Sequence, residues 1–236
     1  MQMNIVKYVL PLLLFAAPTS QANECVVLLH GLARTANSML VLEENLSAAG
    51  YSVLNIGYPS RKKPIEELSE IAVGDGLEGC AAVGASPVNF VTHSLGGILV
   101  RYYFNQHSDK SPGRVVMLGP PNKGSEVVDS FKNLPGFELL NGPAGRQLGT
   151  DAADMPKQLG PVDFELGIIA GTQSVNLIMS AILPSTDDGK VSLESAKVEG
   201  MSDYVAMPVT HPFMMRNDDV IDQVLNFLQH GYFEHE

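Results

Sequence analysis

The sequence predicts an α/β domain in which strands and helices alternate and the sheet is mostly parallel. Short, continuously apolar runs recur along the chain, as expected of strands that are buried on both faces. Segments with apolar residues at helical spacing separate most of these runs, and Gly or Pro marks their ends. The length of 236 residues suits one domain with a sizeable core, and no abrupt change in composition requires a second one.

The alternation is regular in the first half of the chain. The run at 25–30 (CVVLLH) is β-branched, apolar and followed directly by glycine, which is typical of a buried parallel strand. The predicted elements in chain order are a strand at 25–30, a helix at 36–49 ended by Gly50, a strand at 51–56, a helix that Pro64 opens and that continues weakly across Gly74 and Gly76 toward Cys80, and a strand at 88–92.

The second half contains one interruption. The stretch 120–161 is rich in Gly and Pro yet carries large apolar residues, and a structureless loop of this length is uncommon. We therefore expect a small cap insertion at about 122–161. Around it lie a predicted helix at 94–106, strands at 114–118, 164–170 and 204–209, and a closing helix at 218–228 with Asn217 as its cap and Gly231 as its end.

Composition and the N-terminus point to an exported globular protein. Apolar residues make up 45% and charged residues 17% of the chain, which excludes a disordered chain. The net charge of −11 argues against nucleic acid as a partner. Residues 1–22 resemble a signal peptide, so we expect a secreted or periplasmic protein without a stable transmembrane anchor after cleavage.

The two cysteines, Cys25 and Cys80, would meet an oxidising compartment after export. We expect them to form a disulfide bond, and two separately buried thiols are the alternative.

The segment VNFVTHSLGG at 88–97 is the strongest chemical signal. It places Ser94 in a tight turn between a buried strand and a helix, as in the nucleophile elbow G-x-S-x-G. Gly96 satisfies the demand for a small residue after the serine, whereas Thr92 stands where glycine is usual. The context of strand, turn and helix supports Ser94 as a nucleophile.

A second turn at the end of the first strand could supply an oxyanion hole. In His30-Gly31-Leu32, the backbone amide of Leu32 is one candidate donor, and the amide of Leu95, directly after the nucleophile, is the other. The alternative is that this His-Gly turn only ends the strand and starts a loop, with no role in the chemistry.

The base and the acid are expected later in the chain. His211 follows the last predicted strand, where the base belongs, and His93, His107, His230 and His235 are its rivals. Asp188, which precedes a glycine in a loop after the strand at 164–170, is the preferred acid, and Asp187 is its competitor.

These motifs resemble a small bacterial secreted lipase or esterase of the α/β-hydrolase superfamily. The resemblance extends from about Cys25 to the closing helix, and it implies a six-stranded, mostly parallel sheet with helices on both faces and a small cap. Its motifs are HGL at 30–32, THSLGG at 92–97, MLGPPNKGS at 117–125, DGKV at 188–191 and THPFM at 210–214.

The predicted activity is hydrolysis of carboxylic esters through Ser94, His211 and Asp188, with an acyl-enzyme intermediate and no cofactor. Thioesterase, amidase or acyltransferase activity on the same triad, and a non-catalytic binding protein, are the alternatives. We expect an ester substrate with an apolar portion, such as a lipid, facing apolar residues at 134–159 and 175–183. Asp151 and Asp154 are interpreted as part of a solvated loop, so no metal site is expected, and a calcium site at these two residues is the alternative. The sequence leaves the oligomeric state open.

Overall fold

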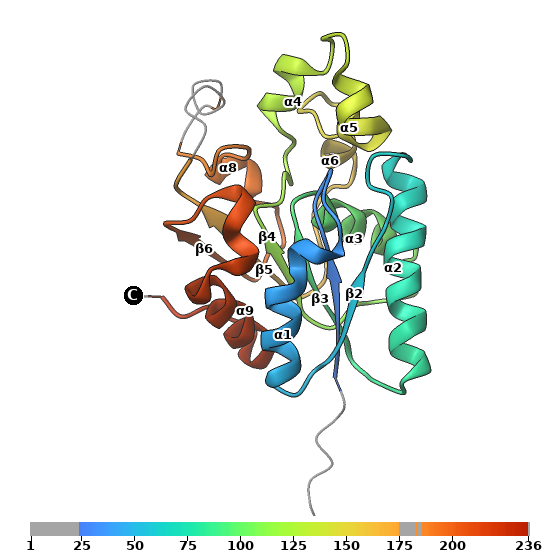
Figure 1. Ribbon diagram of the computed structural model, residues 1–236, viewed down its shortest axis with the longest axis vertical. Helices are drawn as coiled ribbons and strands as arrows, with labels where there is room; N and C mark the ends of the chain where they lie inside the picture. Colours follow the sequence, from blue (N-terminus) through green and yellow to red (C-terminus); the bar gives the residue numbers. More distant parts are fainter. Residues whose placement is uncertain (1–23, 175–182, 184–185, 236) are drawn as a thin grey trace, which may run out of the picture.

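The protein is built around a six-stranded sheet in which all neighbouring strands run parallel. The computed structural model describes residues 24–174, 183 and 186–235, so the predicted signal peptide and most of 175–183 lie outside the described residues. The strand order is β2-β1-β3-β4-β5-β6 (Figure 1). The strands are β1 Cys25–Leu29, β2 Ser52–Ile56, β3 Val88–His93, β4 Val115–Leu118, β5 Leu166–Gly171 and β6 Asp203–Met207.

Helices cover both faces of this sheet (Figure 1). On one face lie α2 Ile65–Ala82 and α3 Leu95–Gln106, and on the other lie α1 Leu40–Ala48 and α9 Asp218–His230. The fold is therefore a three-layer α/β/α arrangement, as the sequence predicted.

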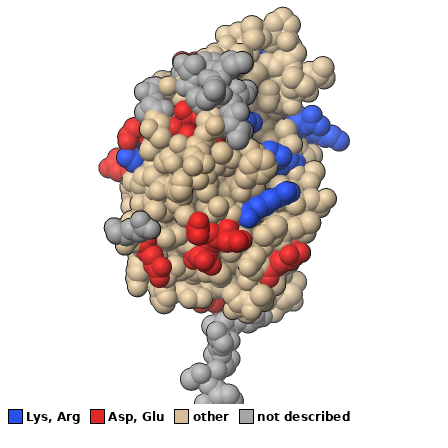
Figure 2. All heavy atoms as spheres, turned by 60° about the vertical axis from the view of Figure 1, so that its left-hand side comes forward, with Lys and Arg blue, Asp and Glu red and all other residues tan. Residues whose placement is uncertain are grey.

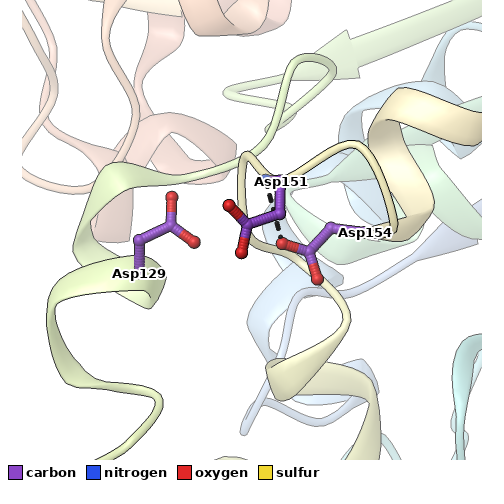
Figure 3. A group of neighbouring side chains, drawn as sticks. All are labelled: Asp129, Asp151 and Asp154. Atoms are coloured by element: carbon purple, nitrogen blue, oxygen red, sulfur yellow. Dashed lines mark hydrogen bonds between the residues drawn. The ribbon is translucent and has the colours of Figure 1, made fainter.

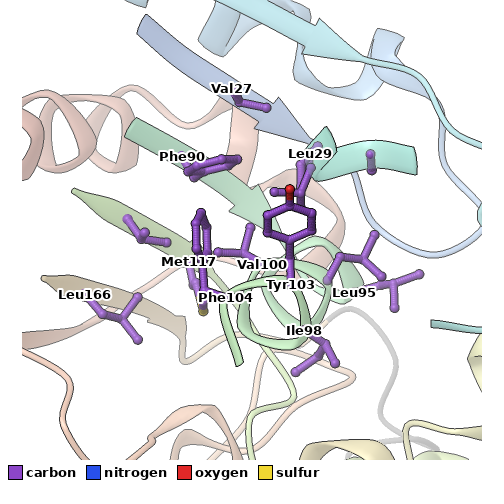
Figure 4. Packing of buried hydrophobic residues seen from close by; sticks show 14 of the residues in the cluster. Val27, Leu29, Phe90, Leu95, Ile98, Val100, Tyr103, Phe104, Met117 and Leu166 are labelled. Carbon is purple, nitrogen blue, oxygen red and sulfur yellow. The ribbon is translucent and has the colours of Figure 1, made fainter. Parts of the chain in front are cut away.

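The period of two along each strand divides the core between the faces. In β1, Val27 and Leu29 pack toward α2 and α3 (Figure 4), whereas Val26 and Leu28 pack toward α1 and α9. All four side chains are fully buried, which explains why the strand is a continuous apolar run rather than an alternating one.

Most predicted elements agree with the structure within a few residues. The first predicted helix begins with a 3₁₀ turn, η1 Ala36–Met39, before α1. Helix α2 continues through its glycines to Ala82, and it packs so closely on β1 that a Cβ at Gly76 would lie 2.6 Å from a Val27 methyl carbon. Two short helices that the sequence did not predict are α8 Leu193–Ala196 and η2 His211–Arg216.

The segment between β4 and β5 stands above the carboxyl ends of the strands (Figure 1). It contains α4 Glu126–Phe131, α5 Phe137–Arg146 and α6 Met155–Gln158. We refer to residues 122–161 as the cap.

Among the helices of the described residues, none is both long and apolar enough to cross a membrane.

A disulfide bond joins Cys25, the first residue of β1, to Cys80 in the last turn of α2, as predicted. Their Cα atoms are 5.8 Å apart, and both side chains are fully buried. The bond links the sheet to the helix at the edge opposite the carboxyl ends of the strands.

Reduction of this bond should lower the free energy of unfolding by about 4 kcal/mol, because the sequence separation is 55 residues and the loss of chain entropy in the unfolded state grows with loop length. Urea unfolding with and without reductant measures this difference. Since Cys25 and Cys80 are the two cysteines of the chain, the double variant Cys25→Ala, Cys80→Ala is the control and should not respond to reductant. Equal stability of the oxidised and reduced protein would contradict the prediction.

Candidate active site

The parallel sheet brings distant segments together at one edge. The loops after β1, β3, β5 and β6 carry Leu32, Ser94, Asp188 and His211, and these four residues line one cavity of about 510 Å³. Ligand sites of open α/β sheets lie at this edge. The structure therefore brings the four predicted residues into one place.

Ser94 occupies the sharp turn between β3 and α3 and is half-buried. Its backbone has φ 52° and ψ −116°, a conformation that costs on the order of 1–3 kcal/mol for a residue other than glycine. Gly96 permits the turn, since a Cβ there would lie 2.6 Å from the carbonyl oxygen of Leu29. Thr92 is buried within β3 and does not prevent this geometry. The sequence motif thus describes a strained elbow that presents the serine to the cavity.

Asp188 is hydrogen bonded to His211. The Nδ1 atom of His211 lies 2.7 Å from Oδ2 of Asp188, and both side chains are buried. The other carboxylate oxygen, Oδ1, accepts bonds from the backbone amides of Lys190 and Val191, each at 2.9 Å. The His211 amide also donates to the Asp188 carbonyl oxygen at 2.9 Å. These bonds hold the carboxylate and the imidazole in a fixed mutual orientation.

Asp187 and the rival histidines have other partners. Asp187 Oδ1 accepts a bond from the Gly189 amide at 2.7 Å, within its own loop. His107 lies beside Glu70, and His235 lies beside Asp203. His230 stacks on Tyr232.

His93, one of the alternative candidates for the base, contacts His211. Its Nε2 lies 3.0 Å from the backbone carbonyl oxygen of His211, and the centroids of the two rings are 4.7 Å apart. Burial, followed by the neighbouring His211, lowers the pKa of His93, which favours the neutral ring. Neutral His93 can donate this bond through Nε2–H and so hold the loop of His211. No sequence pattern distinguished this role from that of a base.

The turn after β1 is fixed by His30 and its neighbours. The ring of His30 stacks on Tyr58 at 4.0 Å between centroids, and the Tyr58 hydroxyl donates to the His30 carbonyl oxygen. Burial lowers the pKa of His30. The amide of Ala33, a residue with φ 56°, donates to Ser60 Oγ at 3.1 Å. This network positions the backbone around Leu32, while Leu95 begins α3 directly behind Ser94.

Gly119 lies within the motif at 117–125, but nothing in the sequence indicated its role in the site. It follows β4, has φ +54°, and packs against the pair formed by Asp188 and His211. A Cβ at this position would lie 2.9 Å from Asp188 Oδ2 and 3.0 Å from His211 Nδ1. Glycine is therefore required both by the backbone angle and by the space.

The cap supplies the apolar part of the cavity wall. Its lining residues come from α4, α5 and the loops beside them, and include Val127, Val128, Phe131, Leu134, Phe137, Leu140 and Leu148. The prediction that apolar residues at 134–159 face the site agrees with this lining. The second predicted segment, 175–183, lies outside the described residues except for Leu183.

Three carboxylates in the cap lie close together, those of Asp129, Asp151 and Asp154 (Figure 3). The ammonium group of Lys132 lies 2.9, 2.7 and 3.2 Å from them, respectively. Its pKa is raised chiefly by the hydrogen bond to Asp151. A lysine thus already provides a positive charge for this cluster, and it ties α4 to the loop before α6.

The contact of Gly119 with the hydrogen-bonded pair predicts a specific loss of activity. For the ester hydrolysis that the sequence predicts, Gly119→Ala should displace Asp188 or His211 and slow the reaction roughly a hundredfold, as expected when reacting groups are misplaced by about 1 Å. Gly84→Ala is the matched control, because Gly84 also has positive φ (+65°) but a Cβ added there would meet no other group within 4 Å. Both variants should lose stability, in the range of about 1 kcal/mol or more, so hydrolysis is measured together with urea unfolding. Equal rates for the two variants would contradict the assigned role of Gly119.

Comparison with known proteins identifies the fold. No protein-family model matches the chain, and no curated protein matches it at a significant level. Among solved structures, the mature lipase BlEst2 of Bacillus licheniformis superimposes with a TM-score of 0.71 at 19% identity, over 88% of this chain and 93% of that one. Phospholipase PlaB from Legionella pneumophila gives 0.67 at 17%, over 89% and 60%, and Aspergillus fumigatus lipase B gives 0.66 at 16%, over 89% and 54%. The chain therefore has the α/β-hydrolase fold.

Proposed function

We propose that the protein is a serine carboxylic-ester hydrolase in which Ser94 is the nucleophile, His211 the base and Asp188 the acid. The observation that carries the proposal is the buried hydrogen bond between His211 and Asp188 in the cavity that the strained Ser94 also lines. The fold supports it, because the superimposed structures include a lipase and a phospholipase.

The first step forms the acyl-enzyme. Ser94 Oγ attacks the ester carbonyl carbon while its proton passes to Nε2 of His211, and Asp188 stabilises the resulting imidazolium through Nδ1. The backbone amides of Leu32 and Leu95 stabilise the negative oxygen of the tetrahedral intermediate. The ester C–O bond then breaks, and the alcohol leaves with the proton from His211.

The second step releases the acid. Water attacks the acyl carbon, its proton passes to His211, and the acyl–Ser94 bond breaks as His211 returns the proton to the serine oxygen. The chemistry needs no group beyond these residues and water. The apolar cap residues are suited to an acyl chain, since burial of each methylene group contributes about 0.8 kcal/mol. We therefore infer that the substrates are esters with an apolar portion.

Export is part of the proposal. The apolar N-terminal stretch at 1–22 and the disulfide bond between Cys25 and Cys80 both support secretion or a periplasmic location.

The two neighbouring aspartates provide the most specific test. Asp188→Asn should reduce kcat for p-nitrophenyl butyrate about 10⁴-fold, because the amide cannot stabilise the imidazolium and favours the wrong tautomer. Asp187→Asn is the matched control and should change kcat by less than about tenfold, and Ser94→Ala should lower kcat on the order of 10⁶-fold. The reverse order of the two aspartate variants would overturn the assignment of the acid, and an active Ser94→Ala protein would overturn that of the nucleophile.

A further inference from the structure

The part of the cavity wall that the cap does not supply carries two basic side chains, Arg34 and Lys190. Arg34 closes the turn after β1, where its amide donates to the Gly31 carbonyl oxygen at 3.2 Å. Lys190 follows Asp188 by two residues, and its amide donates to Asp188 Oδ1. The two residues thus lie in the loops that also carry Leu32, the proposed oxyanion-hole donor, and Asp188, the proposed acid. Both side chains are exposed to solvent.

No carboxylate of the described residues forms a salt bridge with these two charges, although the charge of Asp188 acts on Lys190 and raises its pKa. Asp188 is the acidic residue of the described cavity lining, and its two oxygens are engaged by His211 and by backbone amides. No salt bridge joins Arg34 or Lys190 to a described carboxylate, and residues 175–185 contain no Asp or Glu. Six other described basic residues pair with carboxylates, namely Lys63, Arg114, Lys123, Lys132, Arg146 and Lys197. Arg34 and Lys190 differ from the remaining described basic residues in that they line the cavity.

The overall composition makes this local excess informative. The chain has 26 acidic and 15 basic residues. Two cations beside the proposed nucleophile, without a salt-bridge partner, are therefore opposite in sign to the net charge of the protein. Figure 2 shows most of the basic side chains of one face gathered toward one side, with acidic side chains spread over the rest of that face.

The two cations also influence each other. Surrounding protein lowers the pKa of the Lys190 ammonium, the nearby Arg34 guanidinium lowers it further, and the negative charge of Asp188 opposes both effects. Both charges contribute to the low pKa of His93, after burial and the neighbouring His211. Like charges held close together disfavour each other, and an anion between them would relieve this repulsion.

We propose that Arg34 and Lys190 form an anion subsite that selects esters with an apolar acyl chain and a phosphate or similar anionic group on the alcohol portion. This inference rests on the proposed function. The acyl chain lies along the apolar cap, so the alcohol portion, on the other side of the scissile bond, faces the loops of Arg34 and Lys190. The substrate class is an anionic amphiphile such as a lysophospholipid with a monoester phosphate.

The kinetic test compares two esters that differ in one charged group. In the wild-type protein, kcat/KM for 1-octanoylglycerol 3-phosphate should exceed that for 1-octanoylglycerol. The variant Arg34→Gln, Lys190→Gln should lower this ratio roughly fivefold to tenfold, as expected for two solvent-accessible charge pairs. Higher salt should lower the wild-type ratio by screening. Lys157→Gln, which removes an exposed charge outside the cavity lining, should leave the ratio unchanged.

Two kinetic results would overturn the subsite. One is a ratio that the double variant does not change. The other is an equal loss for both esters, which would mean that the cations act on the reacting carbonyl and not on a substrate anion.

A binding test separates the subsite from the catalytic proposal. Calorimetry with Ser94→Ala protein should show tighter binding of octyl phosphate than of octanol or inorganic phosphate, and the advantage over octanol should disappear when Arg34→Gln and Lys190→Gln are added. Inorganic phosphate that binds as tightly as octyl phosphate would indicate a site for free phosphate and overturn the substrate assignment. Absence of ester hydrolysis by the wild-type protein would overturn the proposed function, whereas this binding result does not depend on hydrolysis.

Discussion

The hydrogen bond between His211 and Asp188 is the interaction on which the geometry of the site depends. It joins the loops that follow β5 and β6, and both of its side chains are buried. Gly119 leaves room for the two side chains, His93 holds the carbonyl oxygen of His211, and two backbone amides bind the remaining oxygen of Asp188. The parallel sheet makes these contacts possible because the carboxyl ends of its strands meet at one edge. A pair held in this way can orient the imidazole toward Ser94 with little reorganisation.

Polar side chains hold both ends of the cap to the rest of the domain, and others link elements within the cap. Arg101 of α3 is buried and donates to the carbonyl oxygens of Asn122 and Gly160, which lie at the two ends of the cap. Burial lowers the pKa of Arg101 to about 10. Within the cap, Lys132 joins three carboxylates from α4 and the loop before α6. The apolar wall therefore has a defined position beside Ser94, opposite loops that bear positive charge. This division of the cavity into an apolar and a basic part is the basis for inferring an amphiphilic substrate.

The strands and long helices could be predicted from sequence because burial on both faces leaves a continuous apolar run and helices leave a periodic one. The nucleophile, base and acid candidates followed from chain order and turn chemistry, and the structure brings these residues to one cavity. In this chain Thr92 is accommodated two residues before the serine, whereas a Cβ at Gly96 would lie 2.6 Å from the carbonyl oxygen of Leu29. The roles of Gly119, His93 and the pair of Arg34 and Lys190 could not be predicted, since these roles arise from contacts between loops that are far apart in the chain. The short helices α8 and η2 were not predicted, because four to six residues are too few to show a helical period of apolar residues.

The central claim is that the strained Ser94 is an activated nucleophile. Labelling with a fluorophosphonate, followed by mass spectrometry of the digested protein, tests it most directly, because the reagent bonds covalently to a serine activated by a neighbouring base. The account predicts modification of Ser94 and strong suppression of labelling in His211→Ala protein. A folded wild-type protein that remains unmodified, or that is modified at another serine, would contradict it.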